Sequence, residues 1–302
     1  MSFKIILFYK YVAIDDPNAL MNEQRAVCGK LNLSGRMIIA KEGINATLEG
    51  TDENIKKYCS HLLKDPKFAG THIKISDGTG NAFPKLSIKV RPEIVASAVD
   101  GLDPNKVSGK YITAEMLHDW IENNKEFYIV DMRNDYEQKV GYFENSILSN
   151  MENFSDLPKL LPKLKHLKGK TIVTVCTGGV RCEKASGFLV KNGFKDVYQL
   201  MGGIVTYMEK YPLEHFKGAL YVFDNRLIMG FNMDNPNRVI VGKCATCSKP
   251  SENYINCKDD FCHRHFICCS NCVDEKNCAI CPMGCRDFSK EHPETQFANL
   301  SK

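Results

Sequence analysis

A cysteine between a predicted strand and a predicted helix lies in the stretch of this chain best suited to nucleophilic chemistry. The β-branched run 171–175 predicts a buried strand, and residues 183–190 predict a helix. Two glycines allow backbone N–H groups to turn toward Cys176, and the helix N-terminus and Arg181 add positive potential. Because these effects favour the thiolate, we expect a depressed pKa and a nucleophilic role for Cys176. The loop reads Cys176-Thr177-Gly178-Gly179-Val180-Arg181-Cys182.

The length of this loop narrows the chemistry. Four residues separate Cys176 from Arg181, whereas cysteine phosphatases need a longer loop to wrap a phosphate. The shorter loop resembles that of rhodaneses, which carry a persulfide on the cysteine. The resemblance implies that Cys176 and Arg181 are catalytic. The cradle for the anion or persulfide would be formed by Thr177, Gly178, Gly179, Val180 and Cys182.

Two structural alternatives stay open in this loop. A lone cysteine in a strand-to-helix turn is usually a packing residue, but the glycine pair and the arginine favour a functional Cys176. Cys182 follows Arg181 directly. It could resolve a persulfide or a sulfenic acid on Cys176, or it could pack in the first helical turn.

A second group of chemically active residues lies near the C-terminus, where ten of the 14 cysteines fall between Cys244 and Cys285. Four close pairs suit two tetrahedral thiolate sites, the first pair joining the third and the second joining the fourth. Zinc is the default metal because it needs no redox role. Disulfides, a redox relay serving Cys176 and an iron–sulfur cluster are the alternatives. The predicted ligands are Cys244, Cys247, Cys257, Cys262, Cys269, Cys272, Cys281 and Cys285.

Length and composition indicate a globular protein. The 302 residues suffice for two or three domains, and 43% hydrophobic and 25% charged residues are ordinary values. No run of about 18 apolar residues predicts a membrane span. The apolar N-terminus is short and bracketed by charges, so we expect a strand there, a cytoplasmic location and no membrane partner. A net charge of +4 permits a nucleic-acid partner without requiring one.

The first 95 residues predict a ferredoxin-like α+β domain, because strands and helices follow in the order βαββαβ. This layout often binds RNA on its sheet. The hairpin Lys41–Thr47 could hold a polar ligand or a phosphate, although a plain connection explains its spacing at least as well. Lys85, Lys89 and Arg91 could contact a phosphate backbone or form a solvated face. The predicted elements span residues 3–9, 17–31, 36–40, 44–48, 52–63, 72–76 and 86–90.

Residues 110–215 predict an α/β domain with a parallel sheet, since strands alternate with helices. Ligands of such folds bind at the carboxyl ends of strands, which is where Cys176 lies. The stretches 131–137 and 202–207 resemble the first and last signatures of rhodanese domains, although Asp131 and Arg133 more readily form a structural ion pair. Residues 216–302 are expected to form a cysteine-rich zinc module with a polar, disordered tail from about residue 288.

Three segments together resemble the bacterial tRNA uridine hydroxylase family. They are residues 41–47, residues 176–186 and the terminal cysteine array, so the resemblance runs along nearly the whole chain. It implies oxygen-dependent 5-hydroxylation of the wobble uridine in tRNA, with molecular oxygen as co-substrate and tRNA as partner. Cys176 would be the active-site cysteine. The electron donor is unknown, and a sulfur- or electron-donor protein is a further candidate partner.

Three hypotheses follow from these observations. The first is the tRNA hydroxylase, the second is a rhodanese-type sulfurtransferase, and the third is a non-catalytic RNA-binding protein with a relic rhodanese domain. The intact Cys176 and Arg181 count against the third. The sequence shows no two-histidine, one-carboxylate triad for non-haem iron and no flavin fingerprint. The product separates the first two hypotheses, because one adds oxygen to the base and the other adds sulfur.

Overall fold

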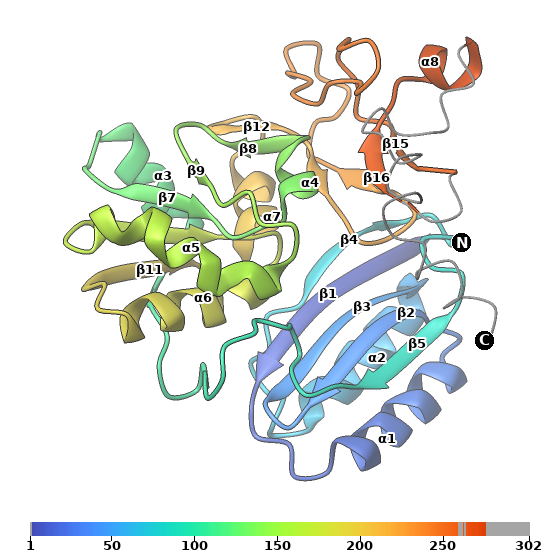
Figure 1. Ribbon diagram of the computed structural model, residues 1–302. Helices are drawn as coiled ribbons and strands as arrows, with labels where there is room; N and C mark the ends of the chain where they lie inside the picture. The colour runs from blue at the N-terminus through green and yellow to red at the C-terminus, as the bar shows by residue number, and fades with distance from the viewer. Residues whose placement is uncertain (1, 259–261, 263, 276–302) are drawn as a thin grey trace, which may run out of the picture.

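The fold is known from a computed structural model, which describes residues 2–258, 262 and 264–275. Two sheets of five strands each dominate it, and small two-stranded units follow toward the C-terminus (Figure 1). Within these described ranges, no helix combines the length and the apolar character needed to cross a membrane. The polar tail predicted from about residue 288 lies outside the described residues.

The N-terminal sheet has the strand order β4-β1-β3-β2-β5. Its first four strands are antiparallel neighbours, which confirms the predicted ferredoxin-like arrangement, and β5 extends the sheet by pairing parallel to β2. Asp16 caps α1 and Thr51 caps α2 by accepting backbone N–H bonds. The elements are β1 (Phe3–Tyr11), α1 (Pro17–Lys30), β2 (Ser34–Ala40), β3 (Gly43–Thr51), α2 (Asp52–Lys64), β4 (Lys74–Gly78) and β5 (Leu86–Val90).

The two faces of this sheet have different partners. Side chains such as Ile6, Phe8 and Met37 point to one face and form a core with α1 and α2. Side chains alternate along a strand, so Leu7 and Tyr9 point to the opposite face. Figure 1 shows both helices on one side of the sheet, which leaves that opposite face open to the rest of the chain.

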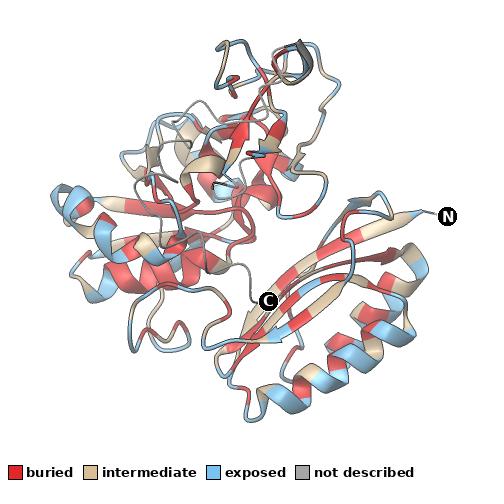
Figure 2. Cartoon of the chain, turned by 45° about the vertical axis from the view of Figure 1, so that its right-hand side comes forward, coloured by how far each residue is buried: buried red, intermediate tan, exposed pale blue. Residues whose placement is uncertain are grey.

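The central sheet is entirely parallel, with the order β6-β11-β10-β7-β9, as predicted for an α/β domain. Helices α5 and α6 pack on one face against Ile172, and α3 and α7 pack on the other against Val173. Figure 2 shows buried residues concentrated in these strands and in α6. The elements are β6 (Lys110–Ile112), α3 (Ala114–Glu122), β7 (Tyr128–Asp131), α4 (Asp135–Gln138), β9 (Ile147–Leu148), α5 (Leu157–Leu164), β10 (Thr171–Val175), α6 (Val180–Lys191), β11 (Asp196–Leu200) and α7 (Gly203–Lys210).

The following segment joins the two sheets. β12 (Phe216–Gly218) pairs with β8 (Gly141–Phe143), and β13 (Leu220–Tyr221) pairs with β14 (Ile228–Met229). The turn of this hairpin holds the N-terminal sheet, because Arg226 donates to the Ser76 hydroxyl at 3.1 Å and Asn225 N–H donates to the Ala82 carbonyl at 2.9 Å. Last come β15 (Tyr254–Asn256), β16 (His265–Ile267) and α8 (Ser270–Glu275).

Candidate active site

The loop between β10 and α6 holds Cys176 in a nest of donors. The Gly179 N–H donates to the Cys176 Sγ at 3.2 Å, and Gly179 has φ +103°, a conformation that favours glycine. The sulfur is fully buried. α6 begins at Val180, so the helix N-terminus also faces this sulfur. The local geometry therefore agrees with the depressed pKa expected for Cys176.

Hydrogen bonds decide the protonation of the two loop cysteines. Burial raises the pKa of the Cys176 thiol, but a hydrogen bond from the Cys182 thiol, the charge of Arg181 and the N–H groups of Cys182 and Gly179 outweigh it and hold the pKa at about 6. Burial and the neighbouring Cys176 sulfur raise the pKa of Cys182 well above its ordinary value. Cys182 thus stays a thiol and donates to the Cys176 thiolate at neutral pH.

This arrangement predicts a thiolate that titrates near pH 6. The ultraviolet absorbance of the thiolate, taken as wild type minus Cys176→Ser, should rise with pH through a midpoint of about 6. Cys182→Ala removes a donor, so its midpoint should move upward. A wild-type midpoint near the ordinary cysteine value of about 8.5 would contradict the assignment.

Arg181 acts on Cys176 through charge, while its own hydrogen bonds go to Glu137 and to the Thr177 hydroxyl. The guanidinium binds both carboxylate oxygens of Glu137, one of them at 2.8 Å, and both side chains are buried. The Thr177 hydroxyl also donates to Glu137, at 3.1 Å. The side chains of Thr177 and Arg181 therefore hold Glu137, and the loop approaches the sulfur mainly through its backbone.

The N-terminal sheet covers the Cys176 loop. A Cβ on Gly178 would lie 2.8 Å from Leu7, and a Cβ on Gly179 would lie 2.9 Å from the Tyr9 hydroxyl. Tyr9 donates to Glu183 of α6 at 3.0 Å. Both glycines are thus needed for this packing, and Gly179 is needed for the turn as well. Sequence reasoning missed the role of β1, because no local pattern links residues so far apart in the chain.

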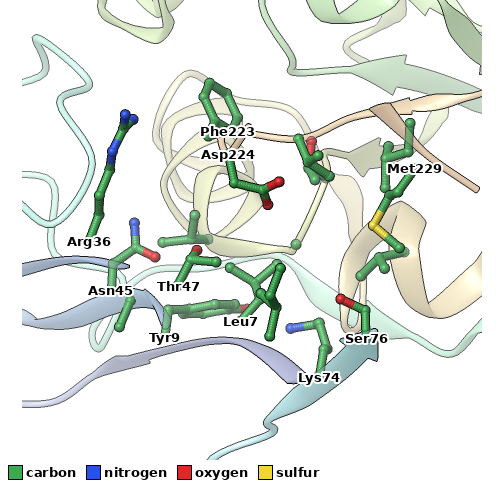
Figure 3. A pocket seen from close by; sticks show the side chains of 18 of the residues that line it. Leu7, Tyr9, Arg36, Asn45, Thr47, Lys74, Ser76, Phe223, Asp224 and Met229 are labelled. Atoms are coloured by element: carbon green, nitrogen blue, oxygen red, sulfur yellow. The ribbon is translucent and has the colours of Figure 1, made fainter. Parts of the chain in front are cut away.

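A pocket of about 400 Å³ lies where the N-terminal sheet, the Cys176 loop and the 220–231 segment meet. Figure 3 shows the labelled side chains of Lys74, Asn45 and Asp224 around this space. Thr177, Gly178, Val180 and Arg181 contribute the wall on the loop side, directly next to the buried Cys176. A volume of this size suits a small ligand or a single nucleotide unit.

The hairpin 41–47 serves both the interface and the pocket. Glu42 pairs with the fully buried Lys184 of α6 at 2.9 Å and accepts the Ile94 N–H at 2.7 Å. Asn45 and Thr47 line the pocket. The hairpin is therefore more than a plain connection. Lys85, Lys89 and Arg91 are exposed, as both interpretations of that basic cluster require.

Two further groups of ionisable side chains lie outside the Cys176 loop. Asp131 and Arg133 form a fully buried ion pair at 2.6 Å, which agrees with a structural role. The sequence indicated no two-histidine, one-carboxylate group, but in the structure the potential ligand atoms of His118, Glu122 and His215 lie within 4.8 Å of one another. The sequence concealed this group, since His215 is distant from α3. None of its three members lines the pocket.

Four cysteines of the predicted array come together. The sulfurs of Cys244, Cys247, Cys269 and Cys272 lie within 4.8 Å of one another, which is the predicted pairing of the first and third pairs. The Cys247 and Cys269 sulfurs are 3.7 Å apart, close to the tetrahedral edge of about 3.8 Å that a Zn–S bond of 2.3 Å gives. This donor set fits zinc. Cys257 and Cys262 lie near it, but Cys281 and Cys285 fall outside the described residues, so the second site stays a prediction.

Replacing one of these four cysteines should lower the amount of zinc that the protein binds. Purified protein is expected to contain zinc by elemental analysis, and Cys247→Ser should lose about one equivalent because a tetrahedral site would keep only three thiolates. Cys59→Ser, a cysteine on α2, is the matched control and should keep the full content. Equal zinc content in the two variants would contradict the site.

The fold and the Cys176 loop define a rhodanese-type protein with an added N-terminal sheet. Family models agree, matching a UPF0176 acylphosphatase-like domain at residues 3–94, a rhodanese-like domain at 113–210 and a rhodanese C-terminal domain at 217–286. A rhodanese-like domain protein from Staphylococcus aureus of known structure is 30% identical and covers 32% of this chain and 90% of its own, with a TM-score of 0.29.

Curated relatives extend the match to nearly the whole chain. The tRNA uridine(34) hydroxylase of Cytophaga hutchinsonii is 40% identical over 97% of this chain and 91% of its own length. The protein of that name from Aster yellows witches'-broom phytoplasma is 41% identical over 98% and 95%. The chain therefore belongs to the tRNA uridine(34) hydroxylase family, as its sequence motifs indicated.

Proposed function

We propose that this protein hydroxylates carbon 5 of uridine 34 in tRNA, with the Cys176 thiolate as the reactive group. The observation that carries this proposal is the near-full-length similarity to curated hydroxylases of that name. The site supports it, because a stabilised thiolate lies next to a pocket to which all three parts of the chain contribute. Within this proposal, Arg181 and the loop backbone stabilise the thiolate, and Cys182 donates a hydrogen bond to it.

The reaction sets the co-substrates. Placing one oxygen atom of dioxygen in the C5–H bond releases the other as water, which consumes two electrons and two protons from a reductant. Dioxygen and a two-electron reductant are therefore part of the proposal, as is zinc in the cysteine cluster. The tRNA substrate makes the cytoplasm the expected location. The division into residues 1–95, 110–215 and 216–302 is supported by the ranges of the three family models.

A rhodanese-type sulfurtransferase is the second candidate. The loop favours it, because a nest of N–H donors that holds a thiolate suits a persulfide equally well. A sulfurtransferase would leave sulfur on its acceptor, whereas a hydroxylase would leave oxygen. The family relationship favours the hydroxylase.

Purified protein tests the proposal directly. It would be incubated with tRNA lacking modification at position 34, isotopically labelled dioxygen and a dithiol reductant, and the nucleosides would be analysed by mass spectrometry. Labelled 5-hydroxyuridine is the expected product. A thiolated uridine would support the sulfurtransferase, and oxygen derived from water would contradict the use of dioxygen.

A further inference from the structure

An isolated cation lies in the wall of the pocket next to Cys176. The Lys74 side chain on β4 is buried, and among the residues that the structure describes it has no ion-pair partner. Its ammonium lies 5.4 Å from the centre of the Tyr9 ring, and Figure 3 shows it directed toward the pocket. Burial lowers the pKa of Lys74 to about 8, partly offset by Cys176. A buried ammonium without a partner is costly, so this position suits a ligand that brings an acceptor.

The same face of the N-terminal sheet also offers an oriented acceptor. The Asn45 amide nitrogen donates to the Ile94 carbonyl at 3.2 Å, which fixes the orientation of the amide. The Asn45 Oδ1 is therefore available to accept a hydrogen bond from a ligand. Figure 3 shows Asn45 beside the same cavity as Lys74.

Sheet geometry places these two groups within reach of one small ring. Lys74 is paired with Leu7, Leu7 with Thr47, and Asn45 lies two residues from Thr47 on the same face of β3. Neighbouring strands are about 4.8 Å apart, so the long Lys74 side chain spans much of the distance above Leu7. A planar ring lying over Leu7 could contact the ammonium with one edge atom and the amide oxygen with the next.

An exposed aromatic ring completes the pocket. Phe223 is 44% exposed although it is large and apolar, and it belongs to the pocket wall on the 220–231 segment. Aromatic side chains in this position stack on nucleobases with little preference for sequence. Arg36 on β2 is exposed and also lines the pocket, where it could meet a phosphate.

We propose that this pocket binds one uracil base turned out of an RNA strand, with Phe223 stacking on the ring and Asn45 and Lys74 reading its polar edge. The Asn45 oxygen accepts the N3–H, and the Lys74 ammonium donates to the O4 carbonyl. Cytosine reverses both groups, presenting a lone pair at N3 and an amine at position 4, so it leaves both protein groups unsatisfied. The inference rests on the proposed function and names the groups that select its base.

The Cys176 loop borders the same pocket. With N3 and O4 held by Asn45 and Lys74, the C5–C6 edge of the ring turns away from Asn45. Thr177, Gly178 and Val180 of the loop line this pocket, so a bound ring lies beside the loop that carries Cys176. Enzymes that act on a base commonly extrude it into such a pocket.

Binding of two anticodon stem-loop RNAs, with U or C at position 34, tests the proposal without requiring turnover. The full-length protein should bind the U34 RNA at least about tenfold more tightly than the C34 RNA. Asn45→Ala and Lys74→Met should bring this ratio close to one. Phe223→Ala should weaken both RNAs by roughly tenfold and keep the ratio, because stacking does not distinguish the bases. Lys195→Met, at an exposed lysine before β11, is the control and should match wild type.

The outcomes separate this inference from the proposed function. A wild-type ratio in both Asn45→Ala and Lys74→Met would overturn base reading by these residues, even if the same preparation hydroxylates tRNA. A ratio close to one in both variants would support base reading by Asn45 and Lys74, even if the wild-type protein fails to hydroxylate tRNA. Lys74→Met should not lower the midpoint of thermal unfolding, because it removes a buried ammonium. Lys74→Arg should keep part of the preference for the U34 RNA that Lys74→Met loses, because it retains a cationic donor.

Discussion

Replacing Cys176 with serine is expected to abolish hydroxylation of tRNA by the purified protein while leaving the fold intact. Serine fills nearly the same volume at this fully buried position, so packing should be kept. Its hydroxyl stays protonated near neutral pH, whereas the Cys176 thiolate is stabilised by Gly179, Cys182 and Arg181. Loss of a nucleophile commonly lowers the rate by several orders of magnitude, so we expect at least about a 1,000-fold loss in single-turnover assays.

A matched variant at the neighbouring cysteine sharpens this test. Cys182→Ser keeps a hydroxyl that can donate to the Cys176 thiolate, so its rate should fall by no more than about tenfold. The two serine variants should unfold at similar temperatures. A Cys176→Ser protein that kept a tenth or more of wild-type activity would exclude Cys176 as the reactive group. A 1,000-fold loss in Cys182→Ser would instead show that Cys182 takes part in the reaction as a thiol.

The largest effect on stability is expected at Glu137. This fully buried carboxylate binds Arg181 through both oxygens and accepts a hydrogen bond from Thr177. Burial raises the pKa of Glu137, but Arg181 and Arg133 outweigh it and hold the pKa below its ordinary value. Glu137→Ala would leave the Arg181 charge buried without its partner. Breaking a buried ion pair in this way typically costs about 3–5 kcal/mol, measurable as a lower urea midpoint.

An exposed ion pair supplies the control for Glu137. Glu53 pairs with Lys57 one helical turn later on α2, and the Glu53 side chain is 77% exposed. Glu53→Ala should change the free energy of unfolding by less than about 0.5 kcal/mol. If Glu137→Ala unfolded at the same urea concentration as Glu53→Ala, the Arg181–Glu137 pair would contribute nothing to stability. The account of how the loop is held would then fail.

Local features of the site could be predicted from the sequence. The β-branched run, the two glycines and Arg181 lie within a few residues of Cys176, so strand, turn and helix follow from neighbouring positions. The spacing of the cysteine pairs likewise indicated which pairs would meet in one cluster, and Cys244, Cys247, Cys269 and Cys272 do meet. The strand and helix order of the first 95 residues was enough to predict the topology of four strands.

The pocket could not be predicted, because it depends on contacts between distant segments. Leu7 and Tyr9 look like ordinary strand residues until β1 packs on Gly178 and Gly179. Lys74 has no sequence signal that separates it from a solvated lysine. What distinguishes Lys74 is the burial of its charge. That burial arises only when the N-terminal sheet, the Cys176 loop and the 220–231 segment pack together.

Nucleoside mass spectrometry of tRNA from cells tests whether Cys176 is required to hydroxylate uridine 34. Cells that lack this protein would be complemented with wild type, Cys176→Ser or the Lys195→Met control. We expect that a 5-oxygenated uridine at position 34 is lost without the protein and is restored by wild type and Lys195→Met, but not by Cys176→Ser. Restoration by Cys176→Ser, or the loss of a thiolated base in place of an oxygenated one, would contradict it.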